Sequence, residues 1–427
     1  MDDVPIEVVG DRVRQARHLR RLDSREVAFF MGWSPPTQTK LEQEASKMLP
    51  RTAASRLAAV LRVPIPFLTA APAPSMSISD LRFRAPKKTT QQEKNYLVQF
   101  ARWVGEFAFR IDEIHNLPPV RLPRPDPCAT TSEIARTTRC ILGVDSSQPI
   151  GHLTHMVERL GIIVVVRVPG TFDVEMWDKA GDVSIEKPDK GERHFGYSTW
   201  IGPYKDRPLS ILRAIDSWER TRWTVAHELG HLLLHRNDLP DDAEVTASRF
   251  ASELLAPVES IRHELGRHVT LADLIPVKLK WGISIGALIR HLRDSETISR
   301  ERADALSRQL YTRINPSTGR TWGIDEPGWD DRSAERPRLL SRWAERCFGT
   351  SSAPALASMI EEWPSDLLNS MLTAQRGPHS KTPRRNIPIK KQSSNKNTVV
   401  PLFPSMPPEE NDDRHGKRRH GDSCTRK

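Results

Sequence analysis

The chain has 427 residues, of which 37% are hydrophobic, and this length is enough for two or three domains with a sizeable core. No run approaches the ~18 consecutive apolar residues that a membrane span needs, and the acidic N-terminal stretch lacks the apolar segment of a secretory signal. The chain has four cysteines, none at C-x-x-C spacing, so we expect free thiols in a reducing cytoplasm, no cysteine-based zinc site and no membrane partner.

The net charge of +10 is concentrated in the C-terminal tail. Residues 376–427 contain thirteen Lys and Arg against five Asp and Glu, which is +8, so the preceding residues carry about +2. This tail is polar, rich in proline and almost free of aromatic residues, and we therefore predict that it is disordered. Two roles stay open for it, non-specific contact with nucleic acid or maintenance of solubility.

Residues 8–69 are predicted to form five short helices. The second helix spans residues 24–31 and is closed by Gly32. Ser34 is suited to cap the third helix, which has Pro35 at its first position. Two short helices joined by a glycine turn in a small helical domain are typical of a helix-turn-helix.

Residues 1–72 resemble the Xre/Cro family of DNA-binding regulators. The matching residues are Gly10-Asp11-Arg12, Ala16-Arg17, Leu22, Glu26-Val27-Ala28, Gly32, Ser34, Thr37, Leu41-Glu42, Leu49-Pro50, Ala58, Leu61 and Val63-Pro64. The sequence departs from the family at Ser24, where a Gln is frequent, and at Gln38, where an apolar residue normally packs the third helix.

The resemblance implies an all-α domain whose third helix enters the major groove of DNA. The expected DNA-contacting residues are Ser34, Thr37, Gln38, Thr39 and Lys40. The alternative to DNA binding is a helix-turn-helix that serves only in packing or in forming a homodimer.

Residues 73–128 are predicted to contain a linker and a long amphipathic helix. Within residues 91–115, one helical stripe contains Leu97, Phe100, Val104, Phe107, Ile111 and Ile114. We expect this stripe to pack against a neighbouring domain rather than to form a free coiled coil. The proline-rich segment LPPVRLPRPDP ends the helix and marks a domain boundary.

The chain from residue 129 to residue 348 mixes helical and strand patterns. The expected strands are IIVVVRV, HFGYSTWI and LSILRAI, and helices follow at residues 244–256, 270–280 and 284–292. A small sheet that precedes the helical segment of residues 221–235 predicts an α+β domain. The whole chain is thus expected to be multidomain, with a helical segment at residues 349–375 before the tail.

The segment TVAHELGHLLLH contains the zinc-protease pattern H-E-x-x-H. His227 and His231 are four residues apart, so both imidazoles project from one helix face and can reach one cation. Glu228 is placed beside the metal, where it can act as the catalytic general base. The alternative is a helix whose histidines are incidental and satisfied by hydrogen bonds.

A third ligand is needed, and the sequence offers several. His235 lies about 12 Å from His227 along the same helix axis, so we expect it to support a ligand or to pack in the core. On the next helix, Glu244 shares the small and apolar face, whereas Glu253 lies on the opposite face. Glu244 is therefore preferred. The weaker loop alternatives are Asp241 and Asp242.

The segments ERTRWTVAHELGHLLLH and EVTASRFASELLAP resemble the two core motifs of the ImmA/IrrE family of zinc metallopeptidases. The resemblance covers roughly residues 130–345 and implies Zn²⁺ held by His227, His231 and, by position, Glu244. The departures from the family are Trp223 for Phe, Ser248 for Asn and Ala256 for Met. None of the three is expected to touch a proposed ligand.

This resemblance implies a function as well. Family members pair a DNA-binding domain with a peptidase that cleaves a repressor, so we expect a site-specific zinc endopeptidase with DNA and a repressor protein as partners. An extended substrate peptide is expected to add to an edge of the small sheet. The sequence does not identify a donor that stabilises the transition state. We suggest His235 and Tyr197 for this supporting role. The alternative is a DNA-binding regulator that uses the zincin domain as a sensor or scaffold.

Overall fold

The computed structural model describes residues 4–82, 89–126, 128–167, 196–213, 217–328 and 331–372. Residues Met1–His379 group into one compact unit, and all the described ranges belong to it. The predicted disordered tail, residues 376–427, lies outside the described ranges. Within those ranges, no helix combines the length and the apolar composition that are needed to cross a membrane.

The N-terminal module contains five helices at the positions expected from the sequence. Their bounds are α1 (Gly10–Leu19), α2 (Ser24–Met31), α3 (Pro35–Gln43), α4 (Arg51–Leu61) and α5 (Ile65–Thr69). The turn after α2 uses Gly32 with φ of 71°, a left-handed conformation that glycine adopts without strain. Ser34 caps α3, since its hydroxyl accepts a hydrogen bond from the Thr37 backbone N–H.

The division of the chain into domains at residues 72, 128, 348 and 375 stays a prediction.

The prediction that this module is all-α is wrong, because it also contains a two-stranded sheet. Strand β1 (Ile6–Val9) pairs antiparallel with β2 (Ser46–Leu49). The sequence IEVV alternates in burial, with Val8 fully buried, and this alternation suits a strand rather than the start of a helix. The partner strand lies about forty residues further along the chain, so the local periodicity of residues 8–19 held no sign of the pairing.

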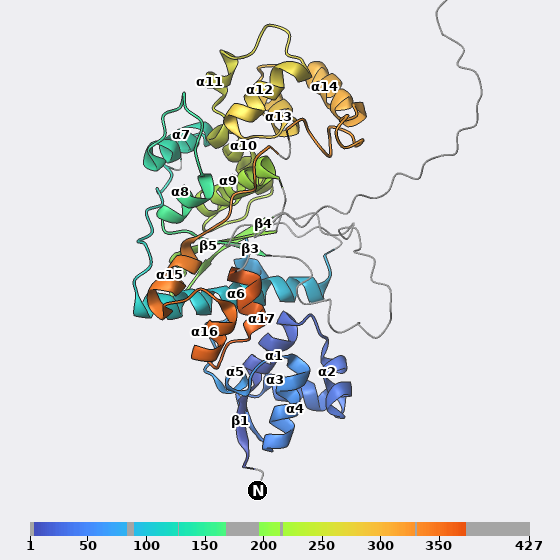
Figure 1. Ribbon diagram of the computed structural model, residues 1–427, viewed down its shortest axis with the longest axis vertical. Coiled ribbons are helices and arrows are strands. Elements are labelled where there is room, and N and C mark those ends of the chain that lie inside the picture. Colours follow the sequence, from blue (N-terminus) through green and yellow to red (C-terminus); the bar gives the residue numbers. More distant parts are fainter. Residues whose placement is uncertain are drawn as a thin grey trace, which may run out of the picture. The chain divides into compact units, whose positions relative to one another are not determined.

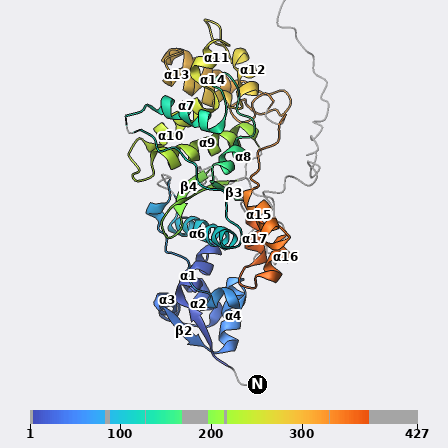
Figure 2. The same cartoon turned by 90° about the vertical axis from the view of Figure 1, so that its left-hand side faces the viewer.

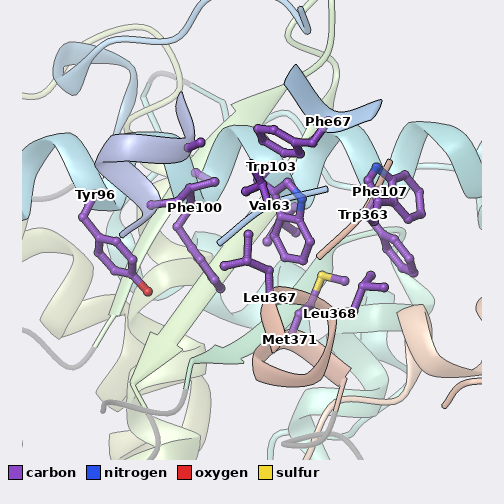
Figure 3. Packing of buried hydrophobic residues seen from close by; sticks show 14 of the residues in the cluster. Val63, Phe67, Tyr96, Phe100, Trp103, Phe107, Trp363, Leu367, Leu368 and Met371 are labelled. Carbon is purple, nitrogen blue, oxygen red and sulfur yellow. The ribbon is translucent and has the colours of Figure 1, made fainter. Parts of the chain in front are cut away.

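Helix α6 (Gln91–Ile114) organises the largest core of the described chain. Its predicted stripe is buried except at Ile114, whose exposed fraction is 47%. The stripe packs against the N-terminal helices and against α15 (Leu339–Phe348), α16 (Ala353–Met359) and α17 (Ser365–Leu372). Figure 3 shows these side chains gathered around α6, with Trp363 beside Phe107; the two ring centroids are 5.0 Å apart. The long helix is therefore a shared structural element, as the amphipathic pattern indicated.

A three-stranded sheet lies between α6 and the helices formed by residues 131–159 and 218–312 (Figures 1 and 2). Its strands are β3 (Ile163–Arg167), β4 (Gly196–Ile201) and β5 (Arg207–Arg213), in the order β3-β5-β4 among the described residues. β3 runs parallel to β5, and β4 pairs antiparallel with β5 in a register that sets Ser198 opposite Ser210. One face packs against α6 through Ile163, Val165, Tyr197, Ile201, Leu209 and Ile211. The other face contributes Val164, Val166, Trp200 and Leu212 to a second core.

The second core is built from helices that precede and follow the sheet in sequence. These are α7 (Thr131–Leu142), α8 (Leu153–Arg159), α9 (Trp218–Leu234), α10 (Ala243–Leu255), α11 (Val258–Arg262), α12 (Leu271–Trp281), α13 (Ile285–Asp294) and α14 (Arg300–Thr312). Helices packed on a small mixed sheet are consistent with the expected α+β domain.

Helix α9 is held in place by a buried ion pair. The guanidinium of Arg222, which is fully buried, lies 2.5 Å from the Glu335 carboxylate. Glu335 also accepts a hydrogen bond of 2.8 Å from the Thr154 backbone N–H at the start of α8. In turn, Glu158 of α8 accepts one of 2.7 Å from the Leu339 backbone N–H at the start of α15, and burial raises the pKa of Glu158 to about 7. The chain before α15 thus ties α8, α9 and α15 together through buried carboxylates.

We expect Trp363→Ala to lower the free energy of unfolding by about 3 kcal/mol, because it opens a cavity where the helices after α15 meet α6. Chemical denaturation of the full chain measures the loss. The control is Met359→Ala, a side chain that is 59% exposed on the neighbouring helix, where the change should stay within about 0.5 kcal/mol. Equal effects of the two substitutions would contradict the shared core.

Candidate metal centre

The candidate site is formed where α9 and α10 pack closely together. A Cβ atom placed on Gly230 would lie 3.2 Å from the Ala247 Cα atom and 3.0 Å from Phe250 Cδ1, which is tighter than ordinary contact. Gly230 and Ala247 therefore allow the two helix backbones to approach each other. The approach brings the face of α10 that carries Glu244 against the face of α9 that carries the two histidines.

His227, His231 and Glu244 converge as the sequence suggested. One ligand atom of each lies within 4.8 Å of those of the other two. The two Nε2 atoms are 3.1 Å apart, and the Glu244 carboxylate oxygens lie 3.3 Å from Nε2 of His227 and 3.5 Å from Nε2 of His231. Both histidines are buried, whereas the Glu244 side chain is 42% exposed, so the cluster opens to solvent on the side of α10.

The Nδ1 atom of each histidine is engaged on the far side of its ring. The Ser248 hydroxyl donates to the Glu244 carbonyl over 2.6 Å, so the oxygen of that hydroxyl is free to accept from Nδ1 of His227, 3.4 Å away. His231 Nδ1 lies 2.9 Å from Nδ1 of His235, and His235 Nε2 lies 2.9 Å from the Thr246 hydroxyl. With both Nδ1 atoms occupied, each Nε2 faces Glu244 and is the atom left to hold a proton or a metal ion.

These contacts make the cluster suited to a cation. Burial alone would raise the pKa of Glu244, but its hydrogen bonds with His227 and His231 hold that pKa well below the usual range. Such contacts need a proton between nitrogen and oxygen, and a cation can take the place of that proton. Two imidazole nitrogens and one carboxylate oxygen are a common protein donor set for a catalytic zinc ion.

Glu228 lies beside the cluster and faces strand β4. Its side chain is buried, and its Oε2 atom has no hydrogen-bond partner among the described residues. Burial raises the pKa of Glu228, and the nearby His231 and His227 oppose that rise only in part. A Cβ atom on Gly196 would lie 2.9 Å from Glu228 Oε1, so this glycine leaves the room that the carboxylate occupies. The buried Ser198 hydroxyl is close enough to Glu228 to lower the pKa of that carboxyl, although it makes no hydrogen bond of ordinary geometry among the described residues.

Two departures from the family pattern contact a ligand, contrary to the expectation that none would. The Trp223 ring stacks on His227 with centroids 4.9 Å apart, and Ser248 reaches Nδ1 of the same histidine. Both positions lie a helical turn from a ligand, at i−4 from His227 and at i+4 from Glu244. This spacing was the signal in the sequence that could have identified them.

Of the suggested supporting residues, His235 is placed at the site and Tyr197 is not. His235 is buried against His231, and burial together with the charge of His231 lowers the pKa of His235 to about 4. Tyr197 points to the opposite face of β4, where its hydroxyl donates to the Leu97 carbonyl over 3.0 Å. Its proposed role at the metal centre is therefore wrong, because alternation along the strand sends it to the α6 side.

The loop and helix alternatives for the third ligand lie outside the cluster. Among the described residues, the only grouping with metal-ligand geometry is the His227, His231 and Glu244 set. Glu253 accepts from the Val258 backbone N–H and lies 3.3 Å from His291. Asp242 occupies the N-cap position of α10 without a side-chain cap.

The expected DNA-contacting residues of α3 divide into exposed and buried positions. Ser34, Thr37, Thr39 and Lys40 are exposed. Gln38 is fully buried and donates to Glu42 over 2.7 Å, so its expected contact with DNA is wrong. It occupies the packing position that is normally apolar. Its amide nitrogen is paired with Glu42, which Arg17 also contacts, whereas its Oε1 atom has no hydrogen-bond partner among the described residues.

Comparison with known proteins agrees with the central part of this region. Residues 185–293 match a family described as the IrrE N-terminal-like domain, a peptidase family. The match spans about a quarter of the chain and is narrower than the expected resemblance over residues 130–345. It includes both histidines, Glu228 and Glu244, and it supports a peptidase-type hydrolase in general terms. Among curated proteins, none matches the chain.

We expect His235→Ala to weaken Zn²⁺ binding about tenfold, because His231 loses the partner that orients its ring. Competition with a chromophoric chelator measures the affinity. The control is His268→Ala, an exposed histidine outside the cluster, which should leave the affinity unchanged. Unchanged binding in His235→Ala would show that His235 only fills space.

Proposed function

We propose that the chain is a zinc metallopeptidase whose metal is held by His227, His231 and Glu244. The observation that carries this proposal is the convergence of these three donors next to a buried carboxylate, Glu228, that has an unpaired oxygen. The match of residues 185–293 to a peptidase family supports it. A structural site would be closed by four protein ligands, whereas three ligands and an adjacent acid suit a catalytic site.

The chemistry can be divided between the metal and the chain. Zinc, when bound, supplies positive charge that polarises the peptide carbonyl and makes water easier to deprotonate. Glu228 accepts a proton from the attacking water at its free Oε2 while the water oxygen bonds to the carbonyl carbon. As the carbon–nitrogen bond breaks, Glu228 gives the proton to the leaving amine.

The supporting residues fix the direction of the ligands. Trp223 and Ser248 hold the His227 ring from two sides, and His235 with Thr246 holds His231. A ring that cannot rotate keeps its Nε2 atom directed at the cluster, which lowers the cost of organising the site.

We expect Glu228→Gln to keep zinc content near the wild-type value and to lower peptide hydrolysis by about 10²–10⁴-fold, because the amide cannot accept the proton. Metal analysis of the purified chain gives the first quantity. Co-expression with a repressor encoded nearby, followed by detection of its cleavage, gives the second. If the substituted chain keeps its zinc and still relieves repression in the cell, the zincin domain serves as a sensor or scaffold and the peptidase proposal is wrong.

We further propose that the N-terminal module binds DNA and couples it to cleavage of a repressor in the cytoplasm. The exposed residues of α3, Thr37, Thr39 and Lys40 with Ser34 at the cap, supply hydroxyl and ammonium groups on one short helix. Such groups suit contacts with base edges and phosphates in the major groove. Repressor cleavage rests on the resemblance to the ImmA/IrrE family.

We expect the double substitution Thr37→Ala and Lys40→Ala to weaken sequence-specific DNA binding at least about tenfold. Selection of duplexes from a random pool by the full chain gives the operator, and fluorescence anisotropy gives the affinity. The control is Gln38→Leu, which changes a buried side chain of the same helix and should leave the affinity near the wild-type value. Undiminished binding by the double variant would remove α3 from the DNA interface.

A further inference from the structure

Strand β4 is the edge of the sheet that lies nearest to the candidate catalytic carboxylate. Among the described strands it pairs only with β5, on one side. The Ser198 carbonyl accepts a hydrogen bond from outside the sheet, so the backbone groups of Gly196, Ser198 and Trp200 point outward by strand alternation. Gly196 adjoins Glu228, and Ser198 is close enough to influence its pKa. An extended peptide paired with this edge would therefore run past the metal centre.

The chain itself already occupies part of this edge. Arg82 forms an antiparallel bridge with Ser198, in which the Arg82 backbone N–H donates to the Ser198 carbonyl over 2.6 Å. The bridge follows directly after the short 3₁₀ helix η1 (Ile78–Asp80). A segment that joins the N-terminal module to α6 thus takes the hydrogen-bonding position that a peptide strand would use.

Four further contacts anchor this segment to β4, to the turn after β4, to the core around α6 and to the residue Arg236 beyond α9. The Thr199 hydroxyl donates to the Asp80 carbonyl over 2.8 Å, and the Lys205 ammonium lies 2.5 Å from the Asp80 carboxylate. The Leu81 side chain is buried in the core around α6. The Arg82 guanidinium donates to the Arg236 carbonyl over 2.7 Å, immediately after His235.

We propose that the outer edge of β4 is the peptide-docking edge of the metal centre and that Ile78–Arg82 occupies it in cis. This inference rests on the proposed peptidase function and adds its regulation. The partner is a polypeptide in extended conformation, recognised through its backbone, and it must displace the Arg82 bridge before it can pair along β4. The segment Ile78–Arg82 continues directly from the N-terminal module. A conformational change in that module can therefore loosen the Arg82 bridge and free the β4 edge beside the metal centre.

The occupation is strong because it is intramolecular. A tethered segment meets the edge at an effective concentration in the millimolar range, so a free peptide competes poorly with it. Removing one backbone hydrogen bond weakens the tethered segment by about two- to tenfold, and the free peptide should gain by the same factor.

The test uses Arg82→Pro, which removes the N–H that donates to Ser198. Leu81 already has φ of −81° and ψ of 132°, an extended conformation that suits a residue before proline. The matched control is Arg82→Ala, which keeps the backbone N–H and loses only the side-chain contact with Arg236. All chains are full length, loaded with Zn²⁺, and carry Glu228→Gln so that the probe is not cleaved.

The probe is a fluorescein-labelled peptide with the sequence of residues 75–82, SMSISDLR, and its Kd is measured by anisotropy. We expect the Kd of the Arg82→Pro chain to be about two- to tenfold lower than that of the Arg82→Ala chain. The Arg82→Ala chain should bind the probe at least as tightly as the chain with Arg82 intact, because it has lost the contact with Arg236. Equal Kd values in the Arg82→Pro and Arg82→Ala chains would overturn the proposal.

A second pair of variants covers the case in which Arg82→Pro does not fold. Thr199→Val removes the hydroxyl that holds the Asp80 carbonyl at nearly constant volume, whereas Thr199→Ser keeps a hydroxyl. Tighter probe binding by Thr199→Val than by Thr199→Ser supports the occupation, and equal binding contradicts it.

The binding measurement is independent of hydrolysis, so the two proposals can fail separately. Hydrolysis is measured on chains with Glu228 intact. If these show no zinc-dependent hydrolysis while the Glu228→Gln chains still show the Kd differences, the peptidase function is overturned and the occupied edge stands. If the chains with Glu228 intact hydrolyse peptide while the Kd values of the Glu228→Gln chains are equal, only the occupied edge is overturned.

Discussion

The candidate metal centre depends on one close approach between two helix backbones. Gly230 on α9 has no room for a Cβ atom, because Ala247 and Phe250 of α10 fill the space in front of it. Glu244 lies one helical turn before Ala247, so the distance between the helices at Gly230 sets how far the carboxylate stands from the two imidazoles. A side chain at this position would separate the helices and withdraw the third ligand. The H-E-x-x-H segment therefore supplies two metal ligands and a base, and through Gly230 it also supplies the surface on which the next helix packs.

A second constraint is that the sheet is shared between two cores. Alternate residues of β4 point to α6 and to α9, and this alternation separates Tyr197 from Glu228 although the two lie close in the fold. Through α6, the first core reaches the N-terminal helices and the helices after α15. Strand β4, which lies beside the metal centre, is therefore packed in the same core as the N-terminal module. The buried pair of Arg222 and Glu335 ties α9 to the start of α8.

The sequence predicted those features that are set within one element. The bounds of α2, the cap on α3 and the common face of His227 and His231 follow from local spacing and from glycine and serine at helix ends. Glu244 was preferred because it shares a face with small residues, and the structure brings it to the histidines. Features set by contacts between distant segments were missed or wrong. These are the β1–β2 pairing, the burial of Gln38, the direction of Tyr197, the contacts of Trp223 and Ser248 with His227, and the bridge between Arg82 and Ser198.

The bridge between Arg82 and Ser198 also bears on how the protein can be divided. The outward backbone groups of β4 are a template for any strand that comes near, and isolated edges of this kind lead to intermolecular pairing. The segment Ile78–Arg82 covers part of that template within the same molecule. A fragment that starts beyond Arg82 would keep both histidines, Glu228 and Glu244 but would lose this cover. The segment before α6 thus protects the β4 edge from pairing with other molecules. A metal-site fragment made without this segment would expose the edge and would be prone to aggregate.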